Sequence, residues 1–131
     1  NLMSKVWPMF TLPTELDPGL VSRSQKVVDD YANDPLVGDV ATARWFTEAK
    51  KAHIDLKDHA NEIDQPFLFL VAGSDGLVDA EATEEVYHRM GSHDRQFEIL
   101  PEYYHEVLNE DGWDELMTQI VEWIEERRPE S

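Results

Sequence analysis

The sequence predicts an α/β protein in which a largely helical first half precedes a parallel β–α–β–α unit. The first of three observations is the apolar run "PFLFLVAG", Pro66–Gly73, whose length and Pro/Gly borders are typical of a strand buried on both faces. The second is the run "QFEIL", Gln96–Leu100, which follows a helical pattern over residues 80–90. The third is an amphipathic helix over residues 111–128. Two strands joined by a helix within ~30 residues form a βαβ unit, so we expect the strands to be parallel.

Residues 1–63 are predicted to be helical and irregular. The segment Asn1–Gly19 holds three of the seven prolines and several apolar anchors, which favours irregular structure. Ser22 and Gln25 have the spacing of a capping box, and Asp39 is a candidate cap for a second helix. The helices expected here cover residues 22–32, 40–52 and, more weakly, 56–62. We expect only two strands in the chain, both in its second half.

The two helices of the second half have clear end signals. For the first of them, Asp79 is the predicted N-cap, and Gly91 lies just past the end. Near the start of the second, Glu110 and Asp111 place negative charge where a helix N-terminus favours it. This last helix has one apolar face at i, i+3, i+4, i+7 spacing, formed by Trp113, Leu116, Met117, Ile120, Val121 and Ile124.

The composition excludes several classes of protein. A formal net charge of −17 argues against binding to nucleic acid or to anionic membrane surfaces, both of which need Lys and Arg. No apolar run reaches the ~18 residues that cross a bilayer. The chain has no cysteine, which rules out disulfides and thiolate chemistry within it and favours a cytoplasmic location.

Two ionisable residues follow the two predicted strands. Asp75 comes after the first strand and His105 after the second, so adjacent parallel strands would place their loops side by side. A carboxylate that binds one imidazole nitrogen fixes the tautomer and leaves the other nitrogen as a base. Each residue also has a plainer interpretation, Asp75 as a turn residue and His105 as a loop histidine. Asp79 is the rival carboxylate for the histidine.

The sequence gives no sign of a metal or cofactor site. The five histidines are His53, His59, His88, His93 and His105, and no two lie three or four residues apart. The stretch "HEVLNE" lacks the second histidine of the zinc motif H-E-x-x-H. We therefore expect neither a bound metal nor a cofactor.

Four stretches of the chain resemble the C-terminal part of the monoglyceride lipase and lysophospholipase group of α/β-hydrolases, which is serine aminopeptidase-like. They are "LDPGLVSRSQKVVDDYANDPLVG", "PFLFLVAGSDGLVD", "YYHEVLNE" and "IVEWIEERR". The resemblance implies a helical cap, or lid, over residues 1–63 and the end of the hydrolase core over residues 64–131. It also implies that Asp75 is the catalytic acid and His105 the catalytic histidine. Among apolar residues of the cap, it makes Leu36, Val37, Trp45 and Phe46 candidates for substrate contact.

One essential part of that family's site is missing from the sequence. The nucleophilic serine belongs in G-x-S-x-G, and no two glycines here are four residues apart. We therefore interpret the chain as the C-terminal fragment of a serine hydrolase. The full-length enzyme is expected to cleave monoacylglycerol- or lysophospholipid-like esters, and this chain alone is expected to be inactive. Its expected partners are a lipid-like ester, the N-terminal remainder of the same protein and, because a two-stranded sheet has open edges, a second copy of the chain. The alternative is a non-catalytic binding module of the same fold.

Overall fold

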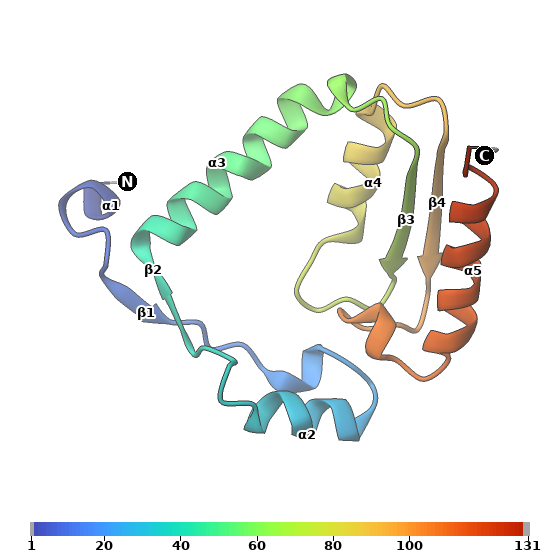
Figure 1. Ribbon diagram of the computed structural model, residues 1–131. Helices are drawn as coiled ribbons and strands as arrows, with labels where there is room; N and C mark the ends of the chain where they lie inside the picture. The colour runs from blue at the N-terminus through green and yellow to red at the C-terminus, as the bar shows by residue number, and fades with distance from the viewer. Residues whose placement is uncertain (1, 130–131) are drawn as a thin grey trace.

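A computed structural model describes residues 2–129 as two connected parts (Figure 1). The first part contains α1 (Leu2–Val6), β1 (Thr11–Pro13), η1 (Pro18–Leu20), α2 (Gln25–Asn33), β2 (Val40–Thr42) and α3 (Ala43–His59). The second contains η2 (Ala60–Glu62), β3 (Phe67–Ala72), α4 (Ala80–Arg89), β4 (Arg95–Leu100), η3 (Val107–Asn109) and α5 (Trp113–Glu125). Among residues 2–129, no helix combines the length and apolar character needed to cross a bilayer.

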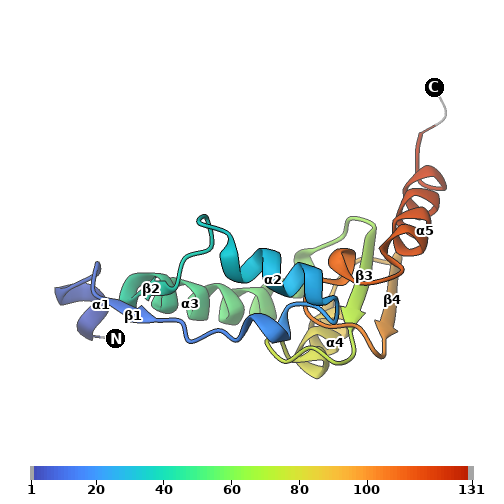
Figure 2. The same cartoon turned by 90° about the horizontal axis from the view of Figure 1, so that it is seen from below.

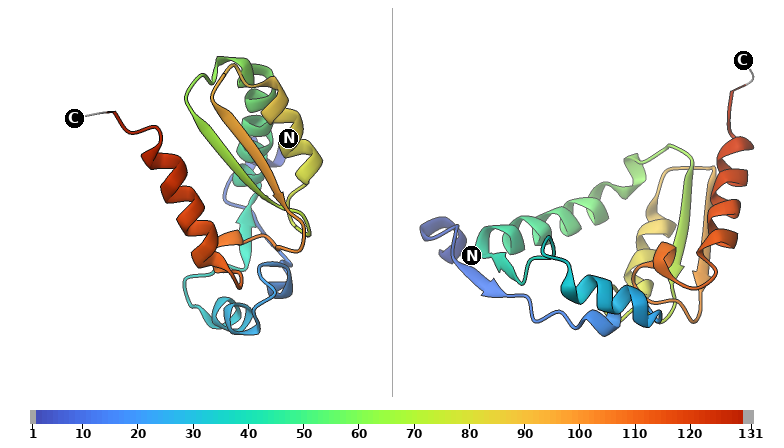
Figure 3. Two further views of the ribbon diagram at one scale, coloured as in Figure 1. Left: turned by 90° about the vertical axis from the view of Figure 1, so that its right-hand side faces the viewer. Right: turned by 60° about the horizontal axis from the view of Figure 1, so that its bottom comes forward.

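The predicted parallel unit is confirmed. Strand β3 pairs with β4 in parallel, from Phe67 opposite Arg95 to Ala72 opposite Leu100. Helices α4 and α5 lie on opposite faces of this pair (Figure 3). On one face, the Tyr87 ring of α4 lies 5.0 Å from the ring of Phe97. On the other face, α5 and β3 line an apolar groove, to which Leu70 of β3 and Ile120 and Trp123 of α5 contribute.

The long helix α3 connects the two parts and is packed at its C-terminal end. Ala60, directly after α3, is fully buried and forms a small core with Val86 and Met90. The Lys57 ammonium of α3 lies 2.7 Å from the carboxylate of Glu85 on α4. In Figure 1 the opposite end of α3, with β1, β2 and α1, lies well away from β3 and β4.

The small antiparallel pair β1–β2 contradicts the expectation of two strands in total. Thr11 pairs with Thr42 and Pro13 with Val40. Because residues 40–42 are extended in this pair, the next helix cannot begin after Asp39 as expected. It begins at Ala43, where the Thr42 hydroxyl accepts the N–H of Trp45 at 3.0 Å.

Other helix boundaries also differ from expectation. The capping box is wrong: α2 begins at Gln25, and the Ser22 hydroxyl instead donates to the Asn109 carbonyl at 3.0 Å. The helix expected over 56–62 is the last turn of α3 followed by η2. The final helix starts two residues late, because Gly112 has a left-handed backbone with φ of 93°.

Seen from below, the first part, residues 2–59, extends away from the β3–β4 unit and is called the arm (Figure 2). Many of its large apolar side chains are exposed, among them Leu2, Trp7, Met9, Leu12, Leu36, Trp45 and Phe46. The segment between η1 and α2 is the part of this arm that returns to the β3–β4 unit, next to η3 (Figure 1).

Candidate active site

The loops that follow β3 and β4 lie side by side at the carboxyl end of the sheet. The Gly73 N–H donates to the Leu100 carbonyl at 2.8 Å, and the Ser74 hydroxyl donates to the Pro101 carbonyl at 2.8 Å. A Cβ on Gly73 would lie only 2.7 Å from the Cα of Pro101. Glycine at this position therefore permits the close approach that aligns the two loops.

The predicted contact between Asp75 and His105 is present. The His105 Nδ1 lies 2.9 Å from the Asp75 Oδ2, within hydrogen-bond distance. The second oxygen of the same carboxylate, Oδ1, accepts the N–H groups of Leu77 and Val78 at 2.7 and 3.0 Å. Asp75 is therefore both the turn residue and the imidazole partner, two roles that the sequence left as alternatives.

Burial and hydrogen bonds act in opposite directions on Asp75. Its side chain is only 10% exposed, and this burial raises the pKa of the carboxyl. The hydrogen bond with His105 and those from Leu77 and Val78 lower it more, so the pKa of Asp75 lies below its ordinary value. The carboxylate is thus charged at neutral pH and accepts a hydrogen bond from the Nδ1–H of the imidazole. With Nδ1 protonated, Nε2 of His105 carries the free lone pair of a base.

The histidine of this pair remains accessible. The His105 side chain is 37% exposed, whereas its carboxylate partner is almost covered. A buried acid behind an accessible imidazole is the arrangement in which the imidazole can exchange a proton with a further group.

The rival carboxylate has a different role. Asp79 caps α4, and its Oδ1 accepts the N–H groups of Glu81 and Ala82 at 2.9 and 3.3 Å. The predicted helix cap is therefore confirmed, and the carboxylate that His105 contacts is that of Asp75.

The four residues predicted for substrate contact all lie on the arm and are exposed: Leu36, Val37, Trp45 and Phe46. Trp45 and Phe46 belong to the first turn of α3, at the end of that helix that lies away from β3 and β4 (Figure 1). Leu36 and Val37 follow α2. The structure places none of them in the hydrogen-bonded cluster around Asp75 and His105, and their part in substrate contact stays a prediction.

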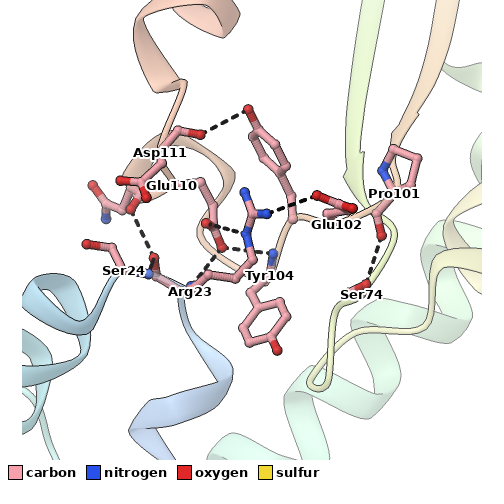
Figure 4. Close-up of polar contacts among 11 residues, drawn as sticks. Arg23, Ser24, Ser74, Pro101, Glu102, Tyr104, Glu110 and Asp111 are labelled. Carbon is pink, nitrogen blue, oxygen red and sulfur yellow. Dashed lines mark hydrogen bonds and ion pairs between the residues drawn. The ribbon is translucent and has the colours of Figure 1, made fainter.

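Sequence reasoning missed Glu110, which is the most deeply buried charged residue near the site. Its side chain is 0% exposed, and its Oε1 accepts the N–H groups of Arg23 and Tyr104, each at 3.0 Å. Its Oε2 accepts the Arg23 Nε at 2.9 Å (Figure 4). Burial raises the pKa of Glu110, but the two backbone donors and the guanidinium outweigh it and leave the pKa below its ordinary value. A glutamate before a predicted helix gave no local sign of a partner 87 residues earlier.

Comparisons with known proteins identify the family of the chain and agree with its fold. Residues 1–112 match the family described as serine aminopeptidase, S33. The chain is 34% identical over 131 residues to an uncharacterized abhydrolase domain-containing protein of Dictyostelium discoideum, covering 97% of this chain and 14% of that protein. It is 24% identical over 128 residues to a putative monoglyceride lipase of Schizosaccharomyces pombe, covering 96% of this chain and 34% of the relative.

A solved structure shows the same arrangement. The crystal structure of the Paleococcus ferrophilus monoacylglycerol lipase superposes with a TM-score of 0.80 at 28% identity, covering 93% of this chain and 48% of that one. The chain therefore spans less than half the length of each of these relatives.

Proposed function

The chain belongs to the serine aminopeptidase S33 family of hydrolases, and on that premise we propose that it supplies the acid and the base of a serine ester hydrolase. The observation that carries the proposal is the Asp75–His105 hydrogen bond at the ends of two parallel strands. The proposed substrates are monoacylglycerol- or lysophospholipid-like esters, a class supported by the similarity to a putative monoglyceride lipase.

Each of the two residues has a defined part in the proposed reaction. Nε2 of His105 removes the proton of a serine hydroxyl as that hydroxyl attacks the ester carbonyl, and then passes the proton to the leaving alcohol. Asp75 holds the imidazole with Nδ1 protonated and stabilises the imidazolium that forms. The same pair then activates water to release the acyl group from the serine.

The nucleophilic serine is proposed to lie outside these 131 residues, in the remainder of the same protein. Two features support a docking place for that remainder on β3. Within residues 2–129, β3 pairs with β4 alone, which leaves its other edge without a strand. Beside it lies an apolar groove, lined among others by Phe67, Leu70 and Trp123, and the Trp123 indole N–H is buried without a partner among the described residues.

The arm is proposed to act as the lid of this enzyme. It carries many exposed apolar side chains, and among them Leu36, Val37, Trp45 and Phe46 are candidates to contact the acyl chain. An apolar lid suits a lipid-like substrate, since burial of acyl CH₂ groups contributes about 0.8 kcal/mol each.

The test uses the full-length protein that contains this chain. It is incubated with 1-monooleoylglycerol, oleoyl lysophosphatidylcholine and a leucine peptide amide, and product release is measured by mass spectrometry. We expect hydrolysis of one or both lipid esters, inhibited by a serine-directed fluorophosphonate. Hydrolysis of the peptide amide alone would overturn the ester assignment, and turnover of none of the three would favour a non-catalytic binding module.

A further inference from the structure

The loop that carries His105 is anchored on both sides of the histidine, by Glu110 on one side and by the arm on the other. The N–H of Tyr104, the residue before it, donates to the Glu110 carboxylate at 3.0 Å. The N–H of Glu106, the residue after it, donates to the Val21 carbonyl at 2.8 Å. The backbone on either side of the imidazole is therefore anchored by groups outside the Asp75 pair.

The arm contributes a short segment to this anchor, residues 21–24. Val21 and Ser22 are almost completely buried there. The Ser22 hydroxyl donates to the Asn109 carbonyl at 3.0 Å, and the Arg23 N–H and Nε both donate to Glu110. Close by, a Cβ on Gly76 would lie 2.9 Å from the Leu20 side chain, so the arm also contacts the loop of Asp75.

Glu110 is the centre of these contacts. A carboxylate that is fully buried needs nearly all of its lone pairs satisfied. Here three donors bind it: the N–H and the Nε–H of Arg23, and the N–H of Tyr104 (Figure 4). Arg23 has a second carboxylate neighbour, Glu102, at 3.4 Å, but that side chain is 85% exposed. An exposed pair of this kind contributes little, because water screens it.

We propose that Glu110 and Arg23 are positioning residues for His105, which hold its loop in the place where the imidazole meets Asp75. The role depends on the proposed hydrolase function, because it is defined by what the imidazole does there. Neither residue touches the Asp75–His105 hydrogen bond itself. They act through the backbone of Tyr104 and through residues 21–24 of the arm.

The chain offers a graded pair of variants and a matched control. In Glu110→Gln, the amide oxygen still accepts the N–H groups of Arg23 and Tyr104, because both bind the same oxygen, Oε1. Its amide NH₂ then faces the Arg23 Nε–H, donor against donor. Glu110→Ala removes both sets of contacts. Glu102→Gln is the control, because it removes the charge of the exposed carboxylate that also neighbours Arg23.

In the full-length protein, we expect kcat for the monoacylglycerol to fall ~10-fold in Glu110→Gln and ~10²-fold in Glu110→Ala, because misplacement of a catalytic group by ~1 Å has effects of that order. KM should stay within ~3-fold, since the change affects the base and not the binding of the ester. Glu102→Gln should match the wild type in both constants.

A second readout does not depend on turnover. Long-range ¹H–¹⁵N correlation spectra of the ring nitrogens, with His105 assigned through a His105→Gln variant, report which nitrogen is protonated in the neutral imidazole. The wild type and Glu102→Gln should show Nδ1 protonated, and the Glu110 variants a mixture of both tautomers. If the wild type has no esterase activity, the proposed function fails, whereas loss of the Nδ1-protonated ring in the Glu110 variants alone would still show that Glu110 holds the imidazole in place.

The positioning role is overturned if either Glu110 variant that melts cooperatively keeps both the wild-type kcat and the Nδ1-protonated ring. If Glu110→Ala does not fold, Glu110→Gln alone decides, because it keeps the two backbone contacts. If Glu102→Gln loses as much activity as the Glu110 variants, the positioning role is also overturned. The effect would then come from the removal of negative charge beside Arg23 and not from the hydrogen bonds of Glu110.

Discussion

Replacement of Asp75 by asparagine separates the two functions of this residue. The asparagine oxygen still accepts the N–H groups of Leu77 and Val78, which Asp75 receives at 2.7 and 3.0 Å, so the turn is kept. The new NH₂ group occupies the place of Oδ2, 2.9 Å from the His105 Nδ1. Since an amide nitrogen donates and does not accept, the imidazole must present a bare Nδ1 and carry its proton on Nε2. In that tautomer it cannot take the proton of the serine.

The magnitude follows from these contacts. The wrong tautomer in such a triad lowers kcat by about 10⁴-fold, which is about 5 kcal/mol in the activation barrier. The cost in folding is smaller, about 1 kcal/mol, because the two backbone hydrogen bonds are kept and their loss of charge is partly offset by the easier burial of a neutral amide. The full-length protein should therefore lose almost all hydrolysis of a monoacylglycerol while its melting temperature changes by only a few degrees.

Asp79→Asn is the matched control for this measurement. It makes the same chemical change four residues away, at a helix cap where asparagine performs as well as aspartate. Its kcat and melting temperature should be close to those of the wild type. If Asp75→Asn keeps kcat within tenfold of the wild type, or if both variants lose activity equally, Asp75 does not orient the catalytic base.

Three further predictions concern the isolated chain and its stability. Residues 1–131 alone should not hydrolyse p-nitrophenyl butyrate above a denatured control or react with a fluorophosphonate, because the sequence has no G-x-S-x-G; fluorophosphonate-sensitive turnover would contradict this. The isolated chain should associate through the unpaired edge of β3 and the apolar groove beside it. Light scattering at micromolar concentration should therefore show a homo-oligomer or aggregates. A monomer that melts cooperatively would refute an exposed docking edge. The pKa of Glu110 is lowered in the folded protein, so the stability that this carboxylate contributes is present above its ordinary pKa of 4.5 and is lost as the pH falls through the lower folded value. In the full-length protein, the free energy of unfolding of Glu110→Gln should therefore depend less steeply on pH below about 4.5 than that of the wild type. Equal slopes would show that folding does not stabilise the carboxylate.

The sequence revealed those parts of the fold whose signals are local. The apolar runs that became β3 and β4 are contiguous, and the helix between them has its own cap at Asp79. Parallel pairing then follows from the short connection, and it brings Asp75 to His105 without knowledge of any other contact. The core of the site was therefore predictable from topology alone.

The features that were missed depend on contacts between distant segments. Strands β1 and β2 are three residues each, too short for a periodic pattern, and their pairing joins Thr11 to Thr42, with η1 and α2 between them in the chain. Ser22 has the spacing of a cap but bonds to Asn109, and Glu110 resembles a helix-start residue but binds Arg23. For both, the tertiary partner decides the role, and no nearby residue indicates it.

The most direct measurement is the kcat/KM of the full-length protein for a monoacylglycerol with His105 replaced by alanine. His105 contacts the buried carboxylate of Asp75, and in the proposed reaction its other ring nitrogen takes the proton of a serine outside this chain. Loss of a triad histidine lowers kcat by about 10⁶-fold in a serine hydrolase, and a fall of several orders of magnitude in kcat/KM is expected here, with cooperative melting retained. A variant that melts like the wild type and retains a near-normal rate would show that the Asp75–His105 pair is not the acid and base of the reaction.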